Sequence, residues 1–336
     1  MYVGTQVAPR NDEDLRQWAQ LGVNNICADP REGNAHTWTR DDLARWRGHV
    51  NSFGIELDMI QLPLSSTPIE KAEAPSIMLG IDPDRDREIE VVNTLIENCA
   101  AVGIPAVKYN MNLIGIPRSE REPGRGGSSN STLRFDKIAD DNAPGIAGEV
   151  SEDEFWERID YFLERIVPVA TENKVRMACH PHDPYTPPGF RGVTRVLGTP
   201  DGLKKFVAMH ESPYHGLNFC QGTVTEMLDD PGEEIFDIIR YFGSREKIFN
   251  VHFRNIRGHK LDFMEVFPDE GSINMFECIK VYQEVGYKYM LMPDHVPHIA
   301  GTDPQGTAFA FVYGYITALL QAIGEPRKQP WVTKGP

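Results

Sequence analysis

Short apolar runs typical of buried strands recur along the chain, and each is followed by a longer segment with apolar residues three and four positions apart. The first pattern predicts a strand, and the second predicts a helix with one buried face. We expect eight strands, over Tyr2–Gln6, Asn24–Ala28, Glu56–Gln61, Ala106–Asn110, Val175–His180, Gly216–Cys220, Ile248–His252 and Tyr287–Met292. Eight helices are expected over Asp12–Gln20, Arg40–Phe53, Arg85–Val102, Glu152–Asn173, Pro200–Met209, Glu233–Phe242, Asn274–Glu284 and Gly306–Ile323.

This alternation predicts an α/β fold, a single (β/α)8 barrel, because each parallel strand needs a crossover helix to return the chain to the start of the next strand. A doubly wound sheet is the alternative, but no G-x-G-x-x-G motif follows the first strand. We expect one catalytic domain over residues 1–325 and a C-terminal tail over 326–336.

The segment 111–150 follows the fourth predicted strand and is too long for an ordinary connection. One interpretation is a flexible surface loop. The other is a lid over the C-terminal end of the barrel or a contact in a homo-oligomer, because Leu133 and Phe135 are apolar side chains that can pack against another surface. The segment also carries four arginines that could attract an anionic substrate: Arg118, Arg121, Arg125 and Arg134.

Composition narrows the classes of function. There are 34 Lys and Arg residues against 49 Asp and Glu, a formal net charge of −15, which argues against a nucleic-acid partner. No apolar run is long enough to span a membrane, so we expect no membrane partner. Five thinly spread cysteines and an acidic N-terminal segment without a signal-peptide core predict reduced thiols and a cytoplasmic location.

The last four predicted strands each lead into a residue that can bind a metal ion: His180, Cys220, His252 and Asp294. A lone strand-end histidine or cysteine is more often structural. The C-terminal ends of barrel strands meet at one end of the barrel, however, so these four side chains are expected to converge there. Two imidazoles, a thiolate and a carboxylate together predict a site for one divalent metal ion.

The expected donor set suits Mn²⁺, Zn²⁺, Fe²⁺ or Co²⁺ and does not choose among them. A structural zinc site is the alternative. Such sites usually use C-x-x-C pairs on short loops, and the chain has none. A metal site spread over a barrel mouth, where water can enter, indicates catalysis instead.

Further polar residues surround the predicted ring. We assign substrate binding to Lys108, Asn110, His182 and Arg254, with Arg254 as the favoured anchor for a carboxylate because its planar guanidinium matches that group. An ion pair at the rim is the alternative for Arg254, and a role behind the metal ligands is the alternative for His182. Tyr313 lies in an apolar helical segment where core packing is favoured over a catalytic role.

Several motifs resemble those of mannonate dehydratases: LRFD, HPHDP, GLNFCQG, VHFRN, DEGSINM and MPDHVP, in order over most of the chain. The resemblance implies a xylose-isomerase-like TIM barrel and a lyase of carbohydrate metabolism. Such an enzyme converts D-mannonate to 2-dehydro-3-deoxy-D-gluconate with Mn²⁺ or a similar ion. It also implies that His180, Cys220, His252 and Asp294 are the metal ligands. Two departures are the Val296–Pro297 pair, where many members have Gly-Arg, and the absence of a tyrosine in the next loop before Tyr313.

The implied reaction removes water from a sugar acid, so it needs a group that takes the C2 proton and one that protonates the departing C3 hydroxyl. The candidates are His295 and Asp294, and His295 is favoured because a carboxylate that binds the metal is a poor base. Tyr313 or a metal-bound water could carry the second proton.

Two other functions are weighed against dehydration. A metal-dependent sugar isomerase or epimerase would use the same barrel, but such enzymes typically bind the metal with several carboxylates. A non-catalytic sensor of sugar acids is disfavoured by the complete predicted set of metal ligands.

Overall fold

Eight parallel strands form a closed barrel in the computed structural model, which describes residues 1–326. They are β1 (Tyr2–Thr5), β2 (Asn25–Cys27), β3 (Glu56–Gln61), β4 (Ala106–Asn110), β8 (Arg176–His180), β9 (His215–Cys220), β10 (Ile248–His252) and β13 (Met290–Met292). Neighbours in the sequence are neighbours in the barrel, and β13 pairs with β1 to close it. The predicted (β/α)8 fold is therefore confirmed.

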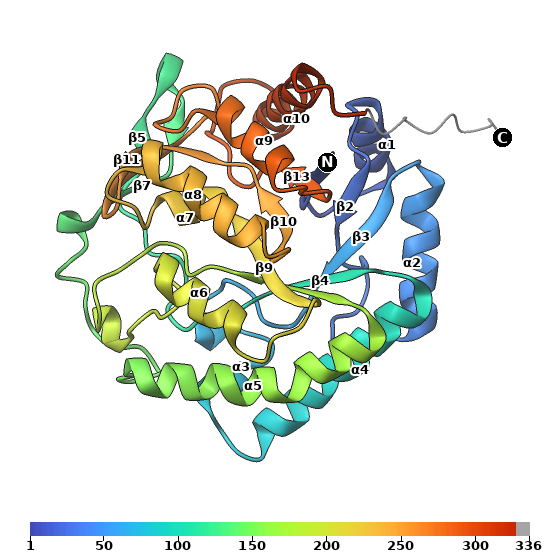
Figure 1. The fold of residues 1–336 in the computed structure, drawn as a ribbon, viewed down its shortest axis with the longest axis vertical. Helices are drawn as coiled ribbons and strands as arrows, with labels where there is room; N and C mark the ends of the chain where they lie inside the picture. Colours follow the sequence, from blue (N-terminus) through green and yellow to red (C-terminus); the bar gives the residue numbers. More distant parts are fainter. Residues whose placement is uncertain (327–336) are drawn as a thin grey trace.

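Helices surround the barrel (Figure 1). The main ones are α1 (Asp12–Gln20), α2 (Arg40–Ser52), α4 (Asp84–Val102), α5 (Glu152–Asn173), α6 (Pro200–Ala208), α8 (Pro231–Gly243), α9 (Met275–Glu284) and α10 (Pro304–Ala322). Two short helices are α3 (Pro75–Leu79) and α7 (Gln221–Thr225). Helix α5 shows how the sequence specifies them: Ser151 and Glu154 form a capping box at its start, and Phe155, Ile159 and Phe162 lie on its buried face.

The buried apolar residues form two groups. A small group that includes Cys27, Met59, Ala178 and Met292 comes mainly from the barrel strands. A much larger group packs the barrel against the helices. All of this lies between β1 and α10, so the described residues before the predicted tail share one continuous fold. The predicted tail lies outside the described residues, except for its first residue.

A second sheet covers one side of the barrel mouth. It joins β7 (Thr132–Arg134), from the long segment after β4, to the hairpin of β11 (Asn255–His259) and β12 (Asp262–Val266) that follows β10. A separate pair, β5 (Glu122–Pro123) and β6 (Ser129–Asn130), lies in the same long segment. Leu133 is fully buried. The strands at 122–134 are therefore paired in sheets and do not form a free surface loop.

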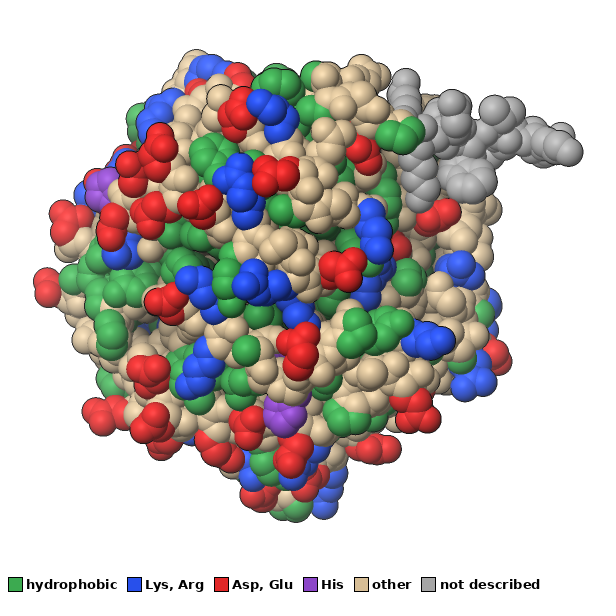
Figure 2. Space-filling model, in the orientation of Figure 1, with side chains coloured by type: hydrophobic (Ala, Val, Ile, Leu, Met, Phe, Trp, Pro, Cys, Tyr) green, Lys and Arg blue, Asp and Glu red, His purple; other side chains and the backbone are tan. Residues whose placement is uncertain are grey.

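The face of the molecule in Figure 2 mixes acidic and basic side chains without a continuous basic area. Among the described residues, no helix combines the length and apolarity that crossing a bilayer requires.

Candidate functional site

Four potential metal ligands meet at the C-terminal end of the barrel. One donor atom from each of His180, Cys220, His252 and Asp294 lies within 4.8 Å of the other three, and all four side chains are buried. The strand register explains the convergence, because Cys220 and His252 are direct partners across β9 and β10. Asp294 follows β13, which pairs with β10 at His252. The structure therefore brings together the four residues that the strand ends predicted.

The hydrogen bonds of the two imidazoles leave one nitrogen of each available. His180 donates from Nδ1 to the Pro181 carbonyl at 2.6 Å, so its Nε2 remains an acceptor. The Nε2 of His252 lies 3.2 Å from the side-chain amide group of Asn218, to whose oxygen it would donate when Nδ1 binds a metal ion. Its Nδ1 is buried without a hydrogen-bond partner, 3.4 Å from Asp294 Oδ1. Buried imidazoles with one nitrogen fixed and the other open fit metal ligands.

The electrostatics of the ring agree with its donor chemistry. Burial lowers the pKa of His180, which favours the neutral imidazole that a metal ion needs. Burial would raise the pKa of Asp294, but His295, His252 and Arg254 hold it well below its usual range. A neutral histidine beside an ionised carboxylate is the state in which both can bind a divalent cation.

A polar cavity of about 370 Å³ lies over the ring, and we call it the deep chamber. Its lining includes Gln6, Gln61, Lys108, Asn110, His180, Asp183, His252, Asp294, His295 and Gln305. Lys108 and Asn110, two of the predicted substrate-binding residues, are thus placed at the cavity. Amide, ammonium and imidazole groups around one chamber suit a ligand with several hydroxyl groups and a negative charge.

Lys108 is largely buried at the end of β4. Its Nζ donates to Gln6 Oε1 at 2.6 Å, and the Gln6 amide donates to Asp294 Oδ1 at 2.8 Å. Within residues 1–326, no carboxylate lies within salt-bridge distance of Lys108. A buried ammonium without a counter-charge is costly unless a ligand supplies one.

A buried ionic cluster lies beside the chamber. It consists of Arg118, Arg254, Asp183, Glu226 and Glu265. The Arg254 guanidinium lies 2.7 Å from Glu265, 3.0 Å from Glu226 and 3.1 Å from Asp183. Arg118 lies 2.6 Å from Asp183 and 2.7 Å from Glu265. Burial raises the pKa of Glu226 well above its usual range. The cluster thus sets two guanidinium groups against three buried carboxyl groups.

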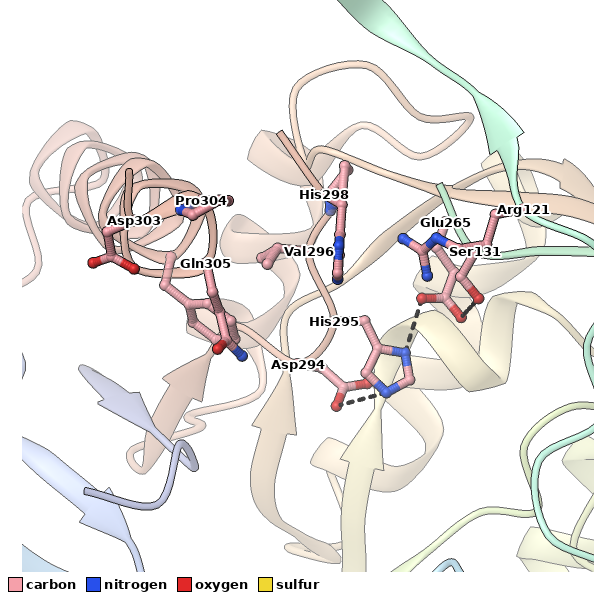
Figure 3. Close-up of a pocket in the computed structure, with 12 residues that line it drawn as sticks. Arg121, Ser131, Glu265, Asp294, His295, Val296, His298, Asp303, Pro304 and Gln305 are labelled. Atoms are coloured by element: carbon pink, nitrogen blue, oxygen red, sulfur yellow. Dashed lines mark hydrogen bonds and ion pairs between the residues drawn. The ribbon is translucent and has the colours of Figure 1, made fainter. Parts of the chain in front are cut away.

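His295 lines the deep chamber, and its side chain is 42% exposed. Its Nδ1 bonds to Glu265 Oε2 at 2.8 Å, while Nε2 lies 3.8 Å from Asp294 Oδ1 (Figure 3). Asp294 and Glu265 raise the pKa of His295 to about 10. The bond to Glu265 fixes the ring and leaves Nε2 as the nitrogen that can exchange a proton with a ligand.

Three predicted site residues do not line either cavity near the ring: Arg254, His182 and Tyr313. The side chain of Arg254 is 1% exposed, and its guanidinium pairs with the buried acids and lies 3.3 Å from Asp294 Oδ2, behind the ring rather than in the cavity. His182 bonds to the Met111 carbonyl and the Leu197 amide, which occupies both ring nitrogens. Tyr313 is packed in the core and donates to Thr5 at 2.7 Å.

Two residues of the site were not found from the sequence. Gln6 follows β1, so it lies at a strand end like His180 and Cys220. The prediction at strand ends concerned metal ligands, and an amide is not a typical one. Glu265 lies in β12, part of the hairpin after β10, and no periodic pattern predicted that hairpin.

A larger cavity of about 610 Å³ adjoins the first, and we call it the outer chamber. The two chambers share Asp294, His295, Gln305 and Phe309. Figure 3 shows Arg121, Ser131 and Glu265 on one side and Asp303, Pro304 and Gln305 on the other. The first two belong to the long segment after β4, so this segment forms one wall of the cavity.

Comparisons of the sequence and of the structure with known proteins point to the same family. The profile of the D-mannonate dehydratase (UxuA) family matches residues 145–325. A mannonate dehydratase of Endomicrobium trichonymphae is 29% identical over 299 residues, which cover 78% of this chain and 77% of the relative. The crystal structure of mannonate dehydratase from Streptococcus suis serotype 2 has a TM-score of 0.83 at 24% identity, covering 100% and 99% of the two chains. A xylose isomerase domain protein of Planctomyces limnophilus has a TM-score of 0.61 at 14% identity, covering 96% and 98%, so the fold is xylose-isomerase-like.

Proposed function

Because this chain belongs to the D-mannonate dehydratase family of hydro-lyases, we propose that it dehydrates D-mannonate to 2-dehydro-3-deoxy-D-gluconate. The observation that carries the proposal is the joint presence of the four clustered donors and the buried, unpaired Lys108 around one polar chamber. A cation site next to an ammonium suits a substrate that is both a carboxylate and a polyol. The family membership disfavours the alternative of a sugar isomerase or epimerase.

We assign the metal-ligand role to His180, Cys220, His252 and Asp294. The donor set and the open nitrogen of His252 support this assignment, and the family resemblance favours Mn²⁺ over Fe²⁺, Co²⁺ or Zn²⁺. A bound divalent ion would supply Lewis-acid stabilisation of the negative charge that develops when C2 loses its proton.

Lys108 is assigned to the substrate carboxylate. Its Nζ is held by Gln6, so the charge has a fixed place in the chamber before the ligand arrives. The amide of Asn110 and that of Gln61, which line the same chamber, can bind hydroxyl groups of the sugar chain. Preorganised polar groups lower the cost of ordering the substrate.

His295 is assigned to proton transfer. A cation bound to Asp294 would offset the carboxylate charge that raises the pKa of His295. The neutral imidazole could then take the C2 proton at Nε2, while Glu265, bonded to Nδ1, stabilises the imidazolium that forms. The C2–H and C3–O bonds break and the C2–C3 double bond forms. The imidazolium returns the abstracted proton to the departing C3 hydroxyl, which leaves as water and restores the neutral His295. The resulting enol becomes the ketone by tautomerisation. Asp294 accepts a hydrogen bond from Gln6, so its role is to bind the cation rather than to move protons.

We further propose a cytoplasmic enzyme that assembles as a homo-oligomer from a single catalytic domain. The five cysteines are all free thiols, which suits a reducing compartment. The segment 111–150 forms a wall of the outer chamber and stays the candidate for a lid or a subunit contact.

One experiment tests the proposed function directly. Purified protein is loaded separately with Mn²⁺, Fe²⁺, Co²⁺ or Zn²⁺ and incubated with a panel of aldonic acids, and the keto-deoxy product is measured. We expect stoichiometric metal and product from D-mannonate. Product from no aldonic acid with any of these ions would contradict the proposal.

A further inference from the structure

The combined cavity has more room than a six-carbon acid requires. The deep chamber, at about 370 Å³, is already within the size range of small-molecule sites, and the outer chamber adds about 610 Å³. The outer chamber opens off the deep one past Asp294 and His295, which line both. A ligand with its reacting carbons at the metal ring can therefore extend beyond His295.

The acidic residues of the outer chamber already have partners. Glu265 is paired with Arg254, Arg118 and His295. Asp303 caps helix α10 by accepting from the Gly306 amide at 3.1 Å. Asp294, the third acidic residue of the lining, belongs to the proposed cation site.

Arg121 is a basic side chain of this chamber that is not neutralised by a carboxylate. Its Nε donates to Ser129 Oγ at 2.9 Å and one Nη donates to the Ser129 carbonyl at 2.5 Å. Within residues 1–326, no carboxylate forms a salt bridge with Arg121, although every other arginine of the segment 111–150 has one. Its remaining Nη carries two N–H donors that have no hydrogen-bond partner in the described part of the chain.

The backbone holds Arg121 in a defined place relative to the catalytic loop. Ser129 and His298 exchange two backbone hydrogen bonds, at 2.8 and 2.9 Å. This bridge joins the hairpin that carries Arg121 to the loop that carries His295. Arg121 lines the same pocket as His298 and Glu265 (Figure 3).

We propose that the outer chamber binds a second anionic group at the far end of the sugar acid, with Arg121 as its partner. The inference rests on the proposed function, in which Lys108 binds the first carboxylate. A carboxylate and a phosphate share the chemistry that a guanidinium recognises, so a six-carbon aldarate and a six-carbon phosphoaldonate are the two candidate substrates.

The test compares three substrates with the metal-loaded wild type and with Arg121→Gln: D-mannonate, the aldarate of the same configuration and the 6-phosphoaldonate. We expect the wild type to prefer one of the dianions. Arg121→Gln should raise KM for that dianion about tenfold or more, leaving kcat and the constants for D-mannonate nearly unchanged. The preferred dianion identifies the second group as carboxylate or phosphate. Competitive inhibition by inorganic phosphate should weaken in the same variant if the group is a phosphate.

Arg125→Gln is the matched control. Arg125 lies in the same hairpin but pairs with Asp269 at 2.6 Å and does not line the cavity, so its loss should leave all constants unchanged. An equal rise in KM for D-mannonate and the dianions in Arg121→Gln would show that Arg121 binds the only carboxylate, which overturns the inference. So would a wild type that dehydrates D-mannonate at least as well as either dianion. Failure of the wild type on all three acids would instead contradict the proposed function.

Discussion

The two ends of the barrel each bury a lysine, and they treat it differently. At the N-terminal end, Lys247 precedes β10 and bonds to the Glu211 carboxylate at 2.6 Å and to the carbonyls of Ser212 and His215 at 2.8 and 3.3 Å. At the C-terminal end, Lys108 has one hydrogen-bond partner within residues 1–326, the neutral amide of Gln6. The first lysine is satisfied by the protein, and the second is left for a ligand.

The difference separates stability from function. Buried polar groups are normally paired, so a lysine that is paired like Lys247 contributes to the folded state and needs no ligand. The open groups, His252 Nδ1 and Lys108, lie at the end where barrel enzymes form their sites. Changes at the C-terminal end should therefore alter activity more than stability, and changes at the N-terminal end should do the reverse.

The largest effect is expected from Cys220→Ala. Removing one of four donors should lower metal affinity by more than about 100-fold, because even partners behind the ligands typically contribute 10- to 100-fold. Activity should fall to background while the far-ultraviolet circular dichroism and the melting temperature change little. Metal content after gel filtration and product formation measure both effects.

Cys179→Ala is the control for that variant. Cys179 precedes His180 in β8 but packs in the core, with its thiol donating to the His180 carbonyl. Its loss should lower the melting temperature and leave the metal content unchanged. Stoichiometric metal in Cys220→Ala would remove Cys220 from the ligand set.

His295→Asn is expected to have the next largest effect. An amide can occupy the space of the imidazole but cannot take a proton, so kcat should fall by about 10²–10⁴ with metal content intact. His298→Asn serves as the comparison, since His298 is exposed on the same loop and lies at the outer chamber only. Near wild-type turnover of D-mannonate by His295→Asn would exclude it as the proton carrier.

Much of this end of the barrel could be predicted because strand ends converge by topology. His180, Cys220 and His252 each end a strand, so a correct count of strands was enough to bring them together. The eight predicted barrel strands differ from the observed ones by only a few residues, the largest difference being the late start of β13 at Met290.

The predicted site residues that do not line the chambers are those whose surroundings depend on side-chain packing. Arg254 follows β10 as expected, yet the accessory hairpin and α7 bring Glu265 and Glu226 against it and remove it from the cavity. That environment depends on a sheet made from two distant segments, β7 and the β11–β12 hairpin. No local periodicity predicts such a pairing.

A moderate effect is expected from Gln6→Ala, which sharpens the comparison of the two lysines. Gln6 connects Lys108 to Asp294, so its loss should release both groups and lower metal affinity or activity about 10- to 100-fold. The measurement is a double-mutant cycle with Lys108→Met on metal affinity and kcat/KM. Strictly additive effects would mean that Gln6 does not act through Lys108.

The smallest effect is expected at the opposite end, in the acid stability of the fold. His215 is fully buried at the start of β9, and its Nε2 donates to the Phe206 carbonyl at 2.9 Å. Burial, together with the nearby charge of Lys247, lowers the pKa of His215 from its ordinary value of 6.5 to about 4. Between pH 4 and pH 6.5, His215 is therefore protonated in the unfolded chain but not in the folded chain.

It follows that this histidine makes the free energy of unfolding decrease as the pH falls from about 6.5 to about 4, by at most about 3 kcal/mol. His215→Gln keeps an N–H donor for Phe206 but cannot titrate, so its stability should decline less over that range. Urea unfolding at several pH values, with exposed His259→Gln as the control, measures the difference. Carboxylates titrate equally in all three proteins and cancel. If the stabilities of His215→Gln and the wild type fell in parallel from pH 7 to pH 4, the neutral state of His215 would not contribute to the pH dependence of stability.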